Sequence, residues 1–316
     1  MTLTPAAASS ANAEALLAET RRVTAADPLD AAYLEGLCRE IDGRIVRGDA
    51  MIGILPVQAY EVLVRGYAAA ALAGRTDVWL PLGQRLLDPR AGRPLAWPSP
   101  HPFPAGDDEA LDSALRCFVE AAGHGSRQGA YLFAAVGRQA VGRVGRYALT
   151  LLEPLRADDP TGEATYWSGI VRYLMGDGEA AVADHQRAAA AGNADAMFEL
   201  HVLYGTGDAV PQDDVVARQW LMRAAERDHP RALYNIAAAY ATGQGFPRDE
   251  AVAAGWYERA ANAGNPRAAA TLGVMCLLGS GVPADPARAA GWLDRAEEQG
   301  FDVDGWLDQL GVRRPS

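Results

Sequence analysis

Lysine is absent from this sequence of 316 residues, so all 29 basic residues are arginines. They are outnumbered by 40 acidic residues, which gives a formal net charge of −11. Nucleic-acid binding rests on clustered basic side chains that displace counterions from phosphates, so the charge argues against nucleic acid as a partner. The lack of lysine, together with abundant alanine, glycine and proline, suggests a bacterial genome rich in GC.

Cysteine and histidine are also scarce. Cys38, Cys117 and Cys276 are far apart, and each lies among apolar residues at helical spacing, which is typical of buried thiols in a reducing compartment. The five histidines show no pairing four residues apart and stand near no cysteine pair, so the ligand spacing of a zinc site is missing. We expect neither a metal nor a cofactor.

Long apolar runs are missing as well. Residues 1–13 contain no basic start and no apolar stretch of signal-peptide length, and no segment reaches the length of a membrane span. We therefore expect a soluble, cytoplasmic protein with no membrane partner. Hydrophobic residues make up 49% of the chain, which is enough for a sizeable core.

The most informative feature that is present is an internal repeat. Trp220, Trp256 and Trp292 are spaced by 36 residues, and an alanine follows each of them by four positions. Other positions recur at the same spacing: Leu200, Ile236 and Leu272; Tyr204, Tyr240 and Cys276; Gly207, Gly243 and Gly279. A fixed period of this length indicates a repeat protein in which neighbouring units share one core.

One repeat unit predicts two antiparallel helices. Its first half carries apolar residues at spacings of three and four, and then Gly243, Gly245 and Pro247 end the helix. Its second half repeats the apolar pattern around Trp256 and Ala260. A pair of this size cannot bury both of its faces alone, so neighbouring pairs must stack.

Residues 268–281, AAATLGVMCLLGSG, followed by AAGWLDRAEEQG, resemble Sel1-like repeats, which are related to tetratricopeptide repeats. His201, Cys276 and Glu297 depart from the pattern of that family without removing the repeat. The resemblance implies an all-α fold, a right-handed α-solenoid of helix pairs, preceded here by a divergent helical N-terminal region.

The domain organisation follows from where the repeat can be traced. Residues 163–300 form the clear repeats, residues 109–162 a divergent helical segment like a repeat, and residues 301–316 a cap and tail with a short helix over 304–310. Helices are also expected in residues 1–87, around 13–26, 29–47, 57–74 and 79–87. The proline-rich segment 88–108 is expected to be a linker; its alternative role is a docking segment that carries Trp97 and Phe103.

Catalytic motifs are weak. The run 136–146, VGRQAVGRVGR, is interpreted as a loop with solvated arginines, with an anion-binding patch as the alternative. Asp107–Asp108 and Asp213–Asp214 are explained by helix capping. Asp302 and Asp304 resemble the opening of a calcium loop but lack its remaining ligands, so we interpret them as a helix start. No catalytic residue is predicted, and the chain is more typical of a binding protein than of an enzyme.

The resemblance to tetratricopeptide units implies that the first helices of the pairs line a concave groove. Counting from the start of each unit places four aromatic residues at one position of this groove: Tyr131, Trp167, Phe198 and Tyr234. Asp195, Arg231 and Arg267 would stand at the helix starts, with Val171, Val202, Ala238 and Val274 one turn along. Such rings offer rigid contact area for a partner, and the arginines could bind its carboxylates. The alternative is that some of these rings pack between repeats.

Three functions remain open. The first is an adaptor or regulator that binds a peptide or protein partner in the groove, as proteins with Sel1-like repeats commonly do. The second is an immunity-type inhibitor of a bacterial toxin, for which the acidity would suit a basic partner. The third is an enzyme or small-molecule binder with a pocket between the N-terminal helices and the repeats.

Overall fold

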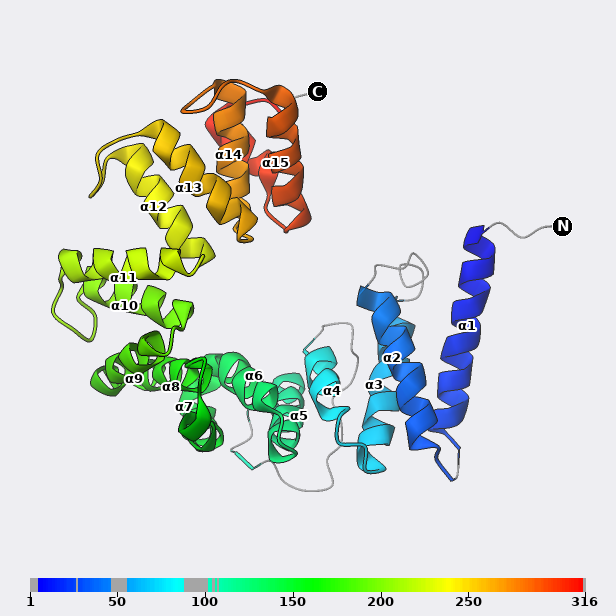
Figure 1. The fold of residues 1–316 in the computed structure, drawn as a ribbon. Coiled ribbons are helices and arrows are strands. Elements are labelled where there is room, and N and C mark those ends of the chain that lie inside the picture. Colours follow the sequence, from blue (N-terminus) through cyan, green and yellow to red (C-terminus); the bar gives the residue numbers. More distant parts are fainter. Residues whose placement is uncertain are drawn as a thin grey trace. The chain divides into compact units, whose positions relative to one another are not determined.

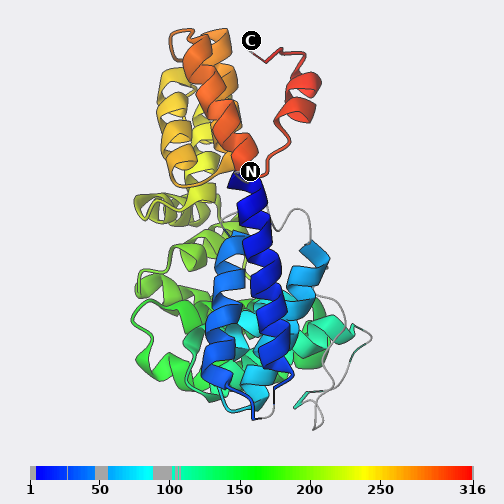
Figure 2. The same cartoon turned by 90° about the vertical axis from the view of Figure 1, so that its right-hand side faces the viewer.

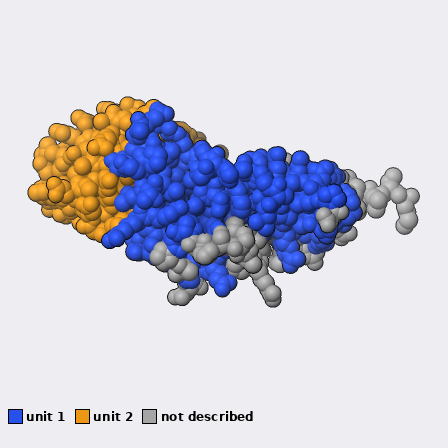
Figure 3. Space-filling view, turned by 90° about the horizontal axis from the view of Figure 1, so that it is seen from below, with its two compact units in different colours: residues 1–158 blue, residues 159–316 orange. Residues whose placement is uncertain are grey.

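The computed structural model describes residues 5–26, 28–46, 56–87, 102–103, 106 and 108–314. The chain divides into two compact units, unit 1 (residues 1–158) and unit 2 (residues 159–316), which have separate colours in Figure 3. Every regular element in these described ranges is a helix, which confirms the all-α prediction. Most of the segment 88–108, including Trp97, falls outside them.

Unit 1 is built from helices (Figure 1). They are α1 (Pro5–Thr24), α2 (Ala31–Val46), α3 (Pro56–Leu72), α4 (Trp79–Leu86), α5 (Glu109–Gly123), α6 (Arg127–Gly137) and α7 (Val141–Leu152). Short 3-10 turns, Arg138–Ala140 and Glu153–Asp158, stand before and after α7. Leu63, Leu82 and Phe118 are among the side chains that this unit buries fully.

The segment 136–146 is helical, so its interpretation as a loop is wrong. Val141 begins α7, and the Nη2 atom of Arg143 lies 2.6 Å from Oδ1 of the buried Asp112. The same guanidinium lies over the ring of Phe103, which is buried against Phe133 at a centroid distance of 5.5 Å. Arg143 is therefore held inside unit 1, and Phe103 is not exposed for docking.

Unit 2 consists of successive helix pairs, and each pair contacts the next one along the chain (Figure 1). The pairs are α8 (Glu163–Leu174) with α9 (Gly178–Ala190), α10 (Ala194–Thr206) with α11 (Asp214–Glu226), α12 (Pro230–Thr242) with α13 (Glu250–Asn262), and α14 (Pro266–Leu278) with α15 (Pro286–Glu298). This arrangement of stacked pairs is the predicted α-solenoid.

The turn inside each of the last three pairs is fixed by two residue types. A glycine ends the first helix with a positive φ, which glycine adopts without steric cost: Gly207 at 73°, Gly243 at 80° and Gly279 at 69°. An aspartate begins the second helix by accepting hydrogen bonds from its first backbone N–H groups: Asp213, Asp249 and Asp285. The loop is therefore capped at both ends, by the glycine that ends the first helix and by the aspartate that precedes the second.

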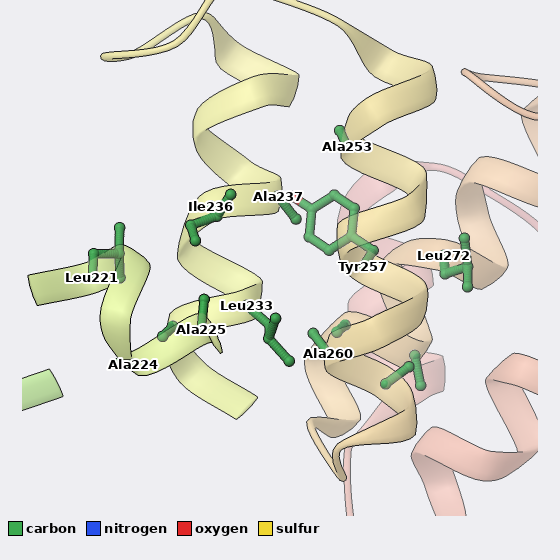
Figure 4. Close-up of a cluster of buried hydrophobic side chains, with 14 of the residues drawn as sticks. Leu221, Ala224, Ala225, Leu233, Ile236, Ala237, Ala253, Tyr257, Ala260 and Leu272 are labelled. Carbon is green, nitrogen blue, oxygen red and sulfur yellow. The ribbon is translucent and has the colours of Figure 1, made fainter. Parts of the chain in front are cut away.

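The core of unit 2 is made largely of alanines with a few larger side chains between them. In Figure 4, Leu233 and Ala237 of α12 lie opposite Tyr257 and Ala260 of α13. Alanines let the two backbones approach closely, and Tyr257 fills the space beside them. Burial of each large apolar side chain stabilises the fold by about 1.5–3 kcal/mol.

A short helix, α16 (Val303–Leu310), follows the last pair and is drawn in red in Figure 2. Asp302 caps it by accepting a hydrogen bond from the backbone N–H of Gly305, as expected of a helix start. Val303 and Leu307 are buried in the core of unit 2. Arg314 then binds Asp294 of α15 at 2.6 Å, which holds the segment after α16 to the last pair.

Candidate functional site

Equivalent caps begin the first helices of the repeats. Asn193, His229 and Asn265 each accept a hydrogen bond from the backbone N–H three residues later, at 2.8, 3.2 and 3.0 Å. The second, fifth and sixth residues after each cap define what we call the first-helix face: Asp195, Phe198 and Glu199; Arg231, Tyr234 and Asn235; Arg267, Ala270 and Thr271. Because the caps are equivalent, these residues occupy matching places on α10, α12 and α14.

Phe198 is a buried member of this face, with only 3% of its surface exposed. Its ring stacks on His229 of the next repeat at a centroid distance of 4.7 Å and an interplanar angle of 21°. The Cζ atom of Arg231 lies 4.4 Å from the centre of the same ring. What faces solvent here is therefore the Arg231 guanidinium, and Phe198 is the support beneath it.

Tyr234 repeats this arrangement one unit later, but its ring is more exposed than that of Phe198. Its half-buried ring meets Tyr257 edge-on at 5.5 Å, and the Cζ atom of Arg267 lies 5.6 Å from its centre. At the third equivalent position, Ala270 provides no ring. The structure thus brings together Phe198 with Arg231 and Tyr234 with Arg267 as two ring–arginine pairs, spaced by one repeat.

On α8 the structure places Tyr166, not Trp167, at the ring position. Tyr166 contacts His185 of α9 at 5.9 Å, as Tyr234 contacts Tyr257 of α13, and both partners lie eight residues after the aspartate that caps their helix. Trp167 is therefore shifted by one residue, to the position of Glu199. The same shift explains why Val171 is buried while Ile170 is half-exposed.

Tyr131 lies on α6 in unit 1 and is half-buried. The first-helix face is defined within unit 2, so Tyr131 is not one of its members. Glu163, Tyr166 and Trp167 are the members that α8 contributes.

The charged residues of the first-helix face are segregated by sign. The exposed second position is Glu163 on α8 and Asp195 on α10, but Arg231 on α12 and Arg267 on α14. Glu199, half-buried on α10, extends the acidic half. The face thus has an acidic half on α8 and α10 and a basic half on α12 and α14.

Burial and neighbouring charges shift the pKa values of the carboxylates in the acidic half in different directions. Burial raises the pKa of Glu199 and of Glu163, and the charge of Asp195 adds to both shifts. The pKa of Asp195 itself is lowered, chiefly by its hydrogen bond with His229. Because Nδ1 of His229 accepts from the Ala232 N–H, its Nε2 carries the proton and donates to Asp195 Oδ1 at 3.3 Å.

Three arginines of the second helices also lie over tryptophan rings of their own helix. Arg223 lies over Trp220 at 4.7 Å, and the other two make further bonds. Arg259 lies over Trp256 at 4.7 Å and donates to Asp228 Oδ1 of the preceding repeat at 2.8 Å. Arg295 lies over Trp292 at 5.4 Å and donates to Asn262 Oδ1 at 2.9 Å. These contacts link one repeat to the one before it.

Other chemistry is weakly represented. Among the described residues, no group of three His, Cys, Asp or Glu side chains is placed to hold a metal ion. The three cysteines are buried and unpaired, and burial raises the pKa of the Cys38 thiol to about 12, which leaves it unreactive. Within the described ranges, no helix combines the length and the apolar character needed to cross a bilayer.

Sequence reasoning missed Glu163, Tyr166, Glu199 and His229. Two of them had a signal: His229 occupies the cap position of Asn193 and Asn265 at the 36-residue step, and Glu199 follows Phe198 directly. Glu163 and Tyr166 had none, because the loop inside the α8–α9 pair is shorter and the period is broken there.

Comparisons with known proteins agree with this repeat geometry. The family model described as "Sel1 repeat" matches three consecutive segments, residues 194–229, 230–265 and 266–301. Each segment starts at the first residue of a first helix and spans one helix pair. A comparison with curated proteins finds no match.

Among solved structures, a Sel1 repeat protein from Oxalobacter formigenes is 37% identical, with a TM-score of 0.39; the match covers 44% of this chain and 98% of that one. A protective antigen present in uropathogenic Escherichia coli strains, described as displaying an SLR fold, is 23% identical with a TM-score of 0.46. That match covers 79% of this chain, and the chain spans about half (53%) of the antigen. From the three matched segments, we conclude that the chain carries Sel1 repeats over residues 194–301.

Proposed function

We propose that this chain is an adaptor or regulator that binds a peptide or protein partner on the first-helix face of unit 2. Sel1 repeats are in general protein–protein interaction modules. The observation that carries the assignment to this face is the pair of exposed guanidiniums, Arg231 and Arg267, each resting on an aromatic ring. A guanidinium held against a ring is ordered before binding, so less side-chain entropy is lost when a partner binds it.

The second helices support this assignment by contrast. Arg259 and Arg295 also rest on rings, but their donors are occupied by Asp228 and Asn262. Among the described residues, no carboxylate lies within ion-pair distance of Arg231 or Arg267. Arg231 and Arg267 thus offer unused hydrogen-bond donors, whereas Arg259 and Arg295 use theirs to join repeats.

An immunity-type inhibitor of a basic toxin is the second candidate. The acidic half of the face favours it, since Glu163, Asp195 and Glu199 would attract a basic partner. It differs from an adaptor in affinity, because an inhibitor must hold a single partner with a very slow off-rate.

The test is partner capture from host lysate on the full chain, followed by hydrogen-exchange mapping of the purified complex. We expect the partner to protect the first turns of α10, α12 and α14. The binding variant is Arg231→Gln with Arg267→Gln, and the matched control is Arg223→Gln with Arg295→Gln, which removes two ring-stacked arginines from the second helices. Protection confined to the second helices, or equal capture by both variants, would show that the first-helix face is not the binding surface.

A further inference from the structure

The charges of the first-helix face offset one another only where α10 meets α12. From α8 to α14 the exposed second position is acidic, acidic, basic and basic. Like charges therefore stand next to each other in neighbouring repeats, and the charge of Asp195 contributes to the raised pKa of Glu163. Opposite signs meet only between α10 and α12, where Asp195 interacts with His229 and Arg231.

The two arginines also oppose the local helix electrostatics. Arg231 and Arg267 lie in the first turn of α12 and α14, where unpaired backbone N–H groups give the helix end a partial positive charge. A basic side chain is unfavourable at this position, while Glu163 and Asp195 are favourable at the same position of α8 and α10. An arginine thus stands at the unfavourable end of two successive first helices. Such departures from local preference are expected at functional surfaces.

Half-buried apolar side chains lie one turn further along the same helices. At the ninth position after the cap, or its equivalent on α8, these are Ile170, Val202 and Ala238. They give the face an apolar strip beside its charged positions. A partner that contacts both therefore needs apolar side chains as well as charges.

Resting on the proposed function, we propose that the partner segment is itself charge-segregated. It is a peptide stretch with a basic cluster that lies over α8 and α10 and an acidic cluster that lies over α12 and α14. Apolar residues between the clusters contact Val202 and Ala238. The acidic cluster binds Arg231 and Arg267, and the basic cluster binds Glu163, Asp195 and Glu199.

Selection from a displayed library of random peptides of about 16 residues against the full chain tests this assignment, because such a peptide spans several repeats when extended. We expect enriched peptides to carry Lys or Arg at one end and Asp or Glu at the other, in either chain direction. In the variant Arg231→Glu with Arg267→Glu, we expect the acidic cluster to vanish from the enriched set and basic residues to take its place. A peptide selected by the wild type should bind this variant at least about tenfold more weakly, the effect expected for close charged contacts at an interface.

The matched control is Arg223→Glu with Arg295→Glu, which changes the net charge equally on the second helices. It should select the same peptides as the wild type, and circular dichroism should show all three proteins equally helical. Enriched peptides without charge segregation, or the same peptides selected by Arg231→Glu with Arg267→Glu, would overturn the inference while leaving the proposed function standing. Failure of every protein to enrich peptides would instead overturn peptide binding on this face, and the inference with it.

Discussion

On α12 and α14 of unit 2 an arginine lies over a ring of the preceding repeat, whereas on α13 and α15 an arginine lies over a ring of its own helix. Arg231 covers Phe198 and Arg267 covers Tyr234, while Arg259 covers Trp256 three residues before it. The guanidiniums of Arg259 and Arg295 then donate to the repeat before them, and those of Arg231 and Arg267 face solvent. The same two side-chain types thus join repeats on one side and form the proposed binding surface on the other.

The largest expected effect concerns the ring beneath Arg231. Phe198→Ala should destabilise unit 2 by about 3–5 kcal/mol, because it removes a buried aromatic side chain and leaves a cavity. Chemical denaturation followed by tryptophan fluorescence measures this change. Phe198→Leu is the control and should cost much less, since it refills most of the volume. A loss of under about 1 kcal/mol for the alanine variant would show that the ring is an exposed contact and not a support.

The second prediction concerns how the stability contributed by His185, a buried residue of α9, depends on pH. Burial lowers the pKa of His185 to about 4, below its usual value near 6.5. As the pH falls from about 6.5 to 4, the unfolded chain takes up a proton that the folded chain does not, so stability is lost across this window by up to about 3 kcal/mol. Denaturation at several pH values should show this slope, and His185→Gln should flatten it. An unchanged slope in the variant would assign the pH dependence to other groups.

The third prediction compares the caps of the first helices. His229→Ala should cost about 1–2 kcal/mol, because the Ala232 N–H loses its acceptor and Phe198 loses its stacking partner. His229→Asn should cost less, since asparagine is the cap at Asn193 and Asn265. Thermal unfolding of the two variants checks the order. Equal losses would mean that the stacking on Phe198, rather than the cap, is the main contribution of His229.

The smallest expected effects on stability are those of removing Arg259 or Arg231. Arg259→Ala should destabilise the array by roughly 0.5–1 kcal/mol, because it breaks a partly exposed ion pair with Asp228 that joins two repeats. Arg231→Ala should change stability by less than about 0.5 kcal/mol, since the lost ring contact is offset by removal of a positive charge from a helix start. Paired denaturation curves measure both. A greater loss for Arg231→Ala than for Arg259→Ala would make Arg231 a structural residue and weaken the proposed binding role.

The repeat fold could be predicted from the sequence because its signals are local. The tryptophans at a spacing of 36, the glycines that end the first helices and the aspartates that begin the second helices are each readable within one unit. The register on α8 could not be predicted in this way. Only residues 175–177 separate α8 from α9, whereas residues 207–213 separate α10 from α11, so aligning on the loop displaces the helix by one residue.

For Phe198 the sequence left two alternatives open, an exposed ring and a ring packed between repeats, and the structure shows the second. Phe198 lies off the apolar stripe of its own unit, which favours an exposed position when that unit is considered alone. The groups that cover it, His229 and Arg231, come from the next unit. The pattern of a single repeat carries no information about what its neighbour places over it.

In the last three repeats, several hydrogen bonds run from a later repeat back to an earlier one. Arg259 donates back to Asp228, Asn265 donates back to the carbonyl of Pro230, Arg288 donates back to Glu258, and Arg295 donates back to Asn262. In each case the acceptor is synthesised before the donor. Since a chain emerges from the ribosome N-terminus first, each of these repeats finds its acceptors already in place when it folds, and the array can grow in step with translation.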